Sequence, residues 1–112
     1  MKSISRGLGG YMSNKEELLE AIEHYDVFTK KQKKILQTLV QASISNKAVI
    51  GVPKLASAAK ATKASVYQTI DLFKKNQTLE VLMSSGGRIT SFLLNEKKLE
   101  EIREIYDTTK NL

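Results

Sequence analysis

The sequence predicts a mostly helical single domain that carries one β-hairpin, and three observations support this fold class. Apolar residues recur at helical spacing in several segments that begin with capping residues. Two segments rich in β-forming residues flank a Gly-Gly pair in the last third of the chain. The 112 residues are 41% hydrophobic and contain no cysteine, so one modest core without disulfides is expected.

The N-terminal part is expected to be a tail followed by an amphipathic helix. Residues 1–12 contain three glycines and no apolar periodicity, which predicts a flexible tail ahead of a single domain over residues 13–112. Lys2 and Arg6 leave open a second interpretation of this tail, as an arm for the DNA minor groove. Ser13 with Glu16 fits a capping box, and the apolar spacing that follows predicts a helix over residues 14–25.

A second capping box, Thr29 with Gln32, predicts a helix over residues 29–43. Four lysines crowd its first two turns, where they oppose the helix macrodipole, so a phosphate backbone is one partner that would favour them. They are Lys30, Lys31, Lys33 and Lys34. The β-branched run over residues 48–52 then predicts a brief strand.

The segment from Pro53 to Leu94 is the most informative. Pro53 suits the first turn of a short helix, and Thr62 is expected to cap a longer helix over residues 63–76. On that second helix Val66, Ile70 and Phe73 fall on one face, which predicts that they are buried. The residues left facing outward are Lys63, Ala64, Tyr67, Gln68 and Asp71.

A hairpin and a closing helix complete the predicted elements. Residues 79–83 and 89–94 are expected to be strands, joined by a two-residue turn in which Gly86 and Gly87 both take positive φ. Asn95 is expected to cap a helix over residues 96–110. One face of that helix carries the apolar stripe Leu99, Ile102, Ile105 and Tyr106.

The charged residues are unevenly distributed along the chain, whose net charge is +6. Residues 28–94 contain eleven lysines and arginines but only two acidic residues, Asp71 and Glu80. Residues 13–27 contain five acidic residues and one lysine. A concentrated positive segment favours binding to a polyanion, and a lysine-rich surface without such a partner is the alternative.

The order of elements over residues 28–94 resembles the winged helix-turn-helix family of bacterial DNA-binding regulators. The residues that carry the resemblance are Leu55-Ala56, Thr62, Ser65-Val66, Gln68, Ile70 and Phe73. They match a Leu-Ala pair, a turn with a hydroxyl cap, a Ser-Val pair, a polar contact residue and two buried apolar residues. The resemblance implies a three-helix core plus a β-wing, here with an extra N-terminal helix and a C-terminal helix.

Two positions depart from the family pattern. Lys60-Ala61 stands where such regulators usually carry glycine, and a left-handed non-glycine residue costs about 1 kcal/mol or more, so a longer variant of the turn is expected. Asn76-Gln77 replaces the glycine that usually follows the second helix. Asn76 is expected to take the left-handed C-cap, which asparagine tolerates nearly as well.

The resemblance also implies a set of DNA contacts. The helix that starts at Lys63 would enter the major groove, where Gln68 pairs with adenine and Ala64 touches a thymine methyl group. Lys63 and Tyr67 would each reach a base edge or a phosphate, and Ser65 a phosphate. Arg88 at the wing tip would enter the minor groove or grip its backbone. Lys54 and Lys47 are expected phosphate clamps.

Several other classes of function find no support in the sequence. His24 is the single histidine and lies among acidic residues, so neither a general base nor a zinc site is expected. The Gly7–Gly10 stretch lacks the Lys-Ser/Thr of a P-loop. We therefore expect no enzyme and no cofactor, and the sequence identifies no small-molecule effector. No apolar run approaches the ~18 residues that would span a bilayer, and a cytoplasmic location is expected.

The sequence thus predicts a regulator that binds double-stranded DNA as a homodimer through the stripe Leu99, Ile102, Ile105 and Tyr106. Packing of this stripe on the chain's own core is the alternative. Two other functions stay open, a plasmid or phage replication initiator and a winged-helix module that binds a protein. The excess of basic residues over residues 28–94 disfavours the last of these unless its partner is acidic.

Overall fold

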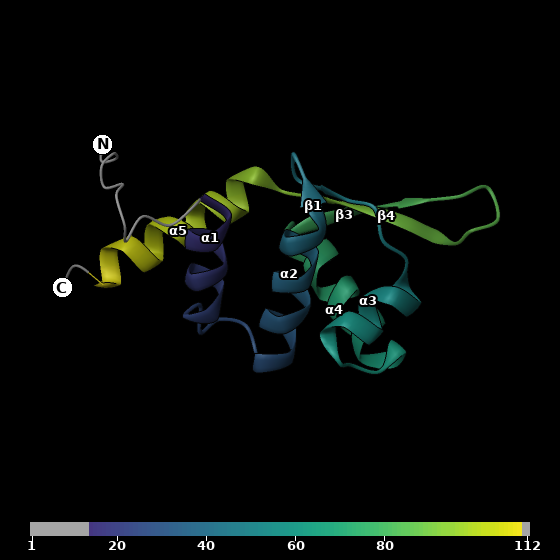
Figure 1. Ribbon diagram of the computed structural model, residues 1–112, viewed down its shortest axis with the longest axis horizontal. Helices are drawn as coiled ribbons and strands as arrows, with labels where there is room; N and C mark the ends of the chain where they lie inside the picture. Colours follow the sequence, from purple (N-terminus) through teal and green to yellow (C-terminus); the bar gives the residue numbers. More distant parts are fainter. Residues whose placement is uncertain (1–13, 111–112) are drawn as a thin grey trace.

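The computed structural model describes residues 14–110, which form five helices and four short strands. In chain order these are α1 (Asn14–Glu23), α2 (Lys30–Ala42), β1 (Ser43–Ile44), β2 (Lys47–Ala48), α3 (Val52–Ala59), α4 (Lys63–Lys75), β3 (Leu79–Met83), β4 (Ile89–Leu94) and α5 (Glu96–Lys110). The predicted fold class is therefore confirmed (Figure 1). The expected tail over residues 1–12 and the Ser13 cap lie outside the described residues.

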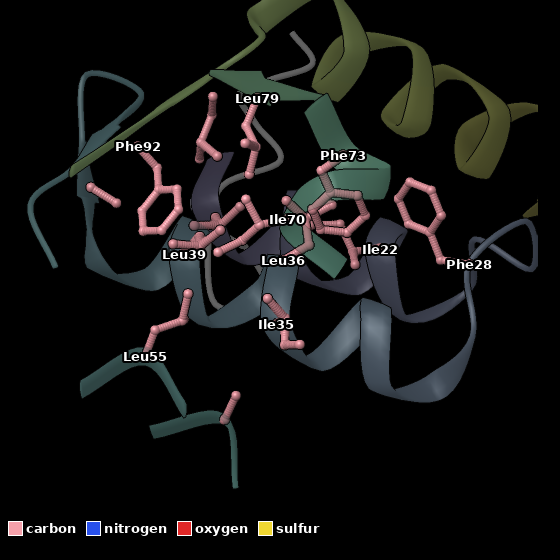
Figure 2. Close-up of a cluster of buried hydrophobic side chains, with 14 of the residues drawn as sticks. Ile22, Phe28, Ile35, Leu36, Leu39, Leu55, Ile70, Phe73, Leu79 and Phe92 are labelled. Carbon is pink, nitrogen blue, oxygen red and sulfur yellow. The ribbon is translucent and has the colours of Figure 1, made fainter. Parts of the chain in front are cut away.

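One hydrophobic core joins α2, α3 and α4 to the inner face of the sheet (Figure 2). Leu36 and Leu39 of α2, Leu55 of α3 and Phe92 of β4 are all fully buried in it. The capping box predicted at the start of α2 is present, since Thr29 accepts a hydrogen bond from the Gln32 backbone and the Gln32 side chain accepts one from Thr29. Burial of these apolar stripes fixes the three-helix core that supports the wing.

The sheet is antiparallel with strand order β1-β2-β4-β3, and its first hairpin differs from the prediction. The strand expected over residues 48–52 is only Lys47–Ala48, paired with Leu93 and Phe92 of β4. Gly51 already serves as the N-cap of α3, so the chain leaves the sheet after Ala48. The unpredicted partner strand β1 precedes a turn in which Ser45 and Asn46 both have positive φ, at 52° and 66°.

The wing turn also differs from the prediction. Only Gly87 has positive φ, at 82°, and its N–H donates to the Ser84 carbonyl at 2.9 Å. The loop closes where the Ser84 N–H donates to the Arg88 carbonyl at 2.8 Å. The expected two-residue turn with two left-handed glycines is therefore wrong. A three-residue loop with one left-handed glycine takes its place, which is the next most common way to join two strands.

The helix α4 ends differently from the expectation as well. Asn76 is the C-cap residue but has φ −93° and ψ 11°, and Gln77 takes the left-handed conformation with φ 63°. The side chain of Asn76 instead accepts hydrogen bonds from the backbone N–H and the hydroxyl of Thr78. Because Thr78 is fully buried, these bonds satisfy polar groups that water cannot reach.

The helices α1 and α5 pack against each other at the end of the molecule opposite the wing (Figure 1). Glu17 and Arg103 form an ion pair at 3.1 Å between them, and the rings of His24 and Tyr106 stack at 5.1 Å. Leu99 and Ile102 are 5% and 0% exposed. These two residues of the predicted dimerisation stripe therefore belong to the chain's own core, whereas Ile105 is 44% exposed and Tyr106 is half-buried.

The two wing glycines provide a test of the loop geometry. Replacing Gly87 by alanine should lower the free energy of unfolding by about 1 kcal/mol, because an L-residue is strained at this positive φ. Gly86→Ala is the matched control, since Gly86 has no positive φ and its added Cβ would meet only the Ser84 hydroxyl, at 3.9 Å. Urea denaturation of both variants measures the difference. Equal effects would contradict the three-residue loop.

The last helix provides a test of which residues stabilise the single chain. Ile102→Ala should reduce the free energy of unfolding by about 2–5 kcal/mol, because it leaves a cavity in the core. Ile105→Ala should change it by less than about 0.5 kcal/mol, as expected of an exposed residue. Both are measured by urea denaturation at several protein concentrations. A large, concentration-dependent loss for Ile105→Ala would show that this residue is buried in an assembly.

Candidate nucleic-acid interface

The helix α4 is fixed at its start by a hydroxyl cap and along its length by buried residues. Thr62 is extended, and its side-chain oxygen accepts a hydrogen bond from the Ser65 N–H at 3.1 Å. Val66, Ile70 and Phe73 are at most 2% exposed, as predicted. Thr69 is buried too, which widens the buried face beyond the apolar residues. The opposite face of α4 is therefore presented to solvent.

The structure brings the sequence-predicted residues of α4 together on that outward face. Lys63, Ala64, Tyr67 and Gln68 are exposed, and Ser65 is half-buried beside them. Asp71 lies on the same face and is the acidic residue that follows them one turn later. The side chains of Lys63, Gln68, Tyr67 and Ala64 supply an ammonium group, an amide, a phenol and a methyl group, in that order. Together these groups can contact phosphates, base edges and a thymine methyl group.

The turn before α4 is shorter than expected because Lys60 itself adopts the left-handed conformation, with φ 55° and ψ 47°. Its N–H donates to carbonyls of α3, and the Ala61 N–H donates to the Ala56 carbonyl at 2.9 Å. The expectation of a longer turn is therefore wrong. These hydrogen bonds end α3 in the manner of a glycine C-cap and offset a backbone cost of about 1 kcal/mol. The ammonium group of Lys60 is left exposed at the turn.

The other predicted basic residues fall into two groups. Lys54 lies exposed in the first turn of α3, and Arg88 is exposed at the wing. Lys47 is exposed on the opposite face of the sheet, because its neighbour Ala48 is buried against the helices. The structure thus separates Lys47 from the surface formed by α4 and the wing, and its role as a phosphate clamp stays a prediction.

The lysine cluster of α2 is also divided. Lys33 donates to the Glu23 carbonyl at 2.9 Å and pairs with the Asp26 carboxylate at 3.2 Å, so its charge is used within the protein. Lys30, Lys31 and Lys34 are exposed. Figure 1 shows the start of α2 on the same side of the molecule as the α3–α4 turn. Three of the four lysines therefore add positive charge to this side.

A notch between α4 and the wing was not predicted from the sequence. It has a volume of about 440 Å³ and is lined by apolar groups of α3, α4 and the hairpin together with one arginine. The side chains that form its rim are Pro53, Tyr67, Met83, Arg88 and Ile89. Met83 and Ile89 carry no motif, and only the pairing of the two wing strands places them opposite each other.

A second cavity, of about 400 Å³, lies between the start of α1, the β1–β2 turn and the start of α5. The sequence predicted no effector pocket, and apolar periodicity alone gives no signal for one at this junction. Within residues 14–110 no group of three or more His, Asp or Glu residues could hold a metal ion. In the same range no helix has the length and apolar character needed to cross a membrane.

No protein-family model and no curated protein sequence matches this chain. Solved structures do resemble it in fold. The YusO protein from Bacillus subtilis has a TM-score of 0.56 and 17% identity, over 86% of this chain and 67% of its own. MepR, described as a transcription regulator of the Staphylococcus aureus multidrug efflux pump MepA, has a TM-score of 0.52 and 15% identity. The MepR match covers 87% of this chain and 70% of that one.

A MepR variant bound to an oligodeoxyribonucleotide is similar to the same extent, with a TM-score of 0.53, 14% identity and the same coverage of both chains. At these identities the likeness concerns the fold. It extends over most of the chain and not over the segment α2–β4 alone. The chain therefore has a winged helix-turn-helix fold similar to those of YusO and MepR.

Proposed function

We propose that this protein binds double-stranded DNA in a sequence-specific manner and acts as a transcription regulator. The observation that carries the proposal is the outward face of α4, which presents Lys63, Tyr67 and Gln68 beside a wing that carries Arg88. This surface lies within a segment of eleven basic and two acidic residues. A rigid helix beside a hairpin, both in a positive field, fits the major groove and the adjacent backbone of a duplex.

Each residue in the proposed interface has a role that follows from its chemistry. Gln68 can pair with adenine through two hydrogen bonds, and Ala64 can touch a thymine methyl group. Ser65 and Lys63, in the first turn of α4, suit phosphates, which the positive end of the helix also attracts. Lys54 and Arg88 contact the backbone on the two sides of the recognition helix, and Arg88 can also enter the minor groove.

The structural comparisons support the regulatory role by analogy. MepR is described as a transcription regulator, and a variant of it was solved with an oligodeoxyribonucleotide. A replication initiator would use the same kind of interface on repeated sites. The two functions would therefore differ in the number and spacing of the binding sites in the genome. Selection from a random pool of duplexes, followed by mapping of the sites in the source genome, tests which of the two the protein is.

We also propose that the protein acts as a homodimer, through the exposed side of the α1–α5 pair. Ile105 and the half-buried Tyr106 are the residues of the predicted stripe that α5 leaves for a partner, since Leu99 and Ile102 are buried. A two-fold dimer would place two α4 helices about one DNA turn apart on a palindromic site. Light scattering at micromolar concentrations tests this proposal independently of DNA binding.

Phosphate contacts should dominate the affinity for DNA. The affinity for a duplex is expected to fall with salt, with a log-log slope of about 0.9 for each phosphate that the protein neutralises. Fluorescence anisotropy with a labelled duplex at several salt concentrations measures the slope. Lys54→Ala should reduce the slope by about 0.9, whereas Lys97→Ala on α5 should leave it unchanged. The absence of binding at low salt would instead favour a module that binds a protein.

Residues that read bases should be separable from residues that hold the backbone. Gln68→Ala and Tyr67→Ala are expected to weaken a selected site by about 1–3 kcal/mol and to affect random DNA little. Arg88→Ala should weaken binding to both DNAs alike. Gln41→Ala, at an exposed glutamine of α2, is the matched control and should change neither affinity. An unchanged site preference in both α4 variants would overturn the assignment of α4 as the recognition helix.

A further inference from the structure

The notch between α4 and the wing is an apolar surface within the otherwise polar interface. Tyr67 and Met83 on its rim are 50% and 61% exposed, although both are large hydrophobic side chains. Val52 forms part of its lining and is only 3% exposed, so the notch is closed behind the rim at this residue. Exposed apolar groups that converge on one concave site indicate a binding surface rather than scattered surface residues.

A bulge in the wing creates one wall of this notch. Leu82 lies opposite Ser91, but the next residue, Met83, lies opposite Ile89, so β4 has one extra residue, Thr90. Without the bulge, Thr90 would lie opposite Met83 and Ile89 would point to the other face of the hairpin. The hydroxyl of Thr90 instead donates to the Leu82 carbonyl at 3.3 Å. The bulge thus puts an isoleucine into the notch in place of a threonine.

The position of the notch restricts what it can contact on DNA. Tyr67 is the neighbour of Gln68 on the outward face of α4, and Arg88 lines the notch from the wing. A duplex held by α4 and by a phosphate contact from Arg88 would therefore pass over the notch with the edge of its major groove. The C5-methyl group of thymine is the one apolar group that base pairs display in that groove.

We propose that Met83, together with Tyr67 and Ile89, recognises the C5-methyl group of one thymine in each bound half-site. Met83 is thus a specificity-determining residue in the wing, outside the recognition helix. The flexible, polarizable side chain of methionine can close over a methyl group at the open side of the notch. This inference rests on the proposed DNA binding, since the ligand is a base of the bound duplex.

Single replacement of thymine by deoxyuridine in the selected duplex tests the inference, because it removes only the methyl group. Replacement of one particular thymine in each half-site should lower the affinity of the protein for the duplex about fourfold, which corresponds to one buried methyl group. Replacement of the other thymines should lower the affinity less. Met83→Ala should bind the thymine duplex about fourfold more weakly and should no longer distinguish thymine from deoxyuridine there. Met83→Leu should keep the distinction, whereas Met83→Gln should lose it.

One control variant separates the possible outcomes. Val27→Ala removes an exposed apolar residue from the link between α1 and α2, 73% exposed, and should leave the distinction between thymine and deoxyuridine intact. Tight binding with no effect of any deoxyuridine would overturn the inference and leave the proposed function standing. A deoxyuridine effect that persists in Met83→Ala would also overturn it and would assign the methyl contact to residues other than Met83. Failure of the wild-type protein to bind any duplex would overturn both proposals.

Discussion

The rotation of α4 about its own axis is the constraint on which the rest of the interface depends. Phe73 is fully buried, with its ring centroid 5.0 Å from that of Phe28, whose ring lies 4.9 Å from that of Tyr25. This aromatic contact ties the end of α4 to the link between α1 and α2. Because each residue advances a helix by about 100°, a slip of one position would bury Tyr67 or Gln68 and expose core residues.

The short connections from α3 to α4 and from α4 to β3 have unusual backbone conformations and fix the position of α4. Lys60 before it and Gln77 after it are both left-handed, with φ of 55° and 63°. Each costs about 1 kcal/mol relative to glycine, and each is balanced by hydrogen bonds that end a helix. In the connection after α4, the Asn95 side chain donates a hydrogen bond to the Gln77 carbonyl at 2.7 Å and so links the end of α4 to the start of α5.

The sequence was sufficient to predict the helices and the outward face of α4, because apolar spacing and hydroxyl caps are local signals. Thr29 and Thr62 begin their helices as expected, and Val66 and Ile70 are buried. The backbone details were not predictable in the same way. Whether Asn76 or Gln77 becomes left-handed depends on hydrogen bonds to Thr78, and the wing bulge depends on the register with a partner strand. Tertiary contacts decide these points.

The unequal distribution of charge has a consequence for the speed of encounter with DNA. The protein is elongated, measuring 47 × 24 × 24 Å, with the acidic α1 at the end opposite the wing. The excess of acidic residues over residues 13–27 and of basic residues over residues 28–94 makes the charge distribution of the molecule asymmetric. In the electric field of a polyanion, a molecule with such a charge distribution reorients before it makes contact. For the proposed binding to DNA, this reorientation would convert collisions that begin with the acidic end into productive ones.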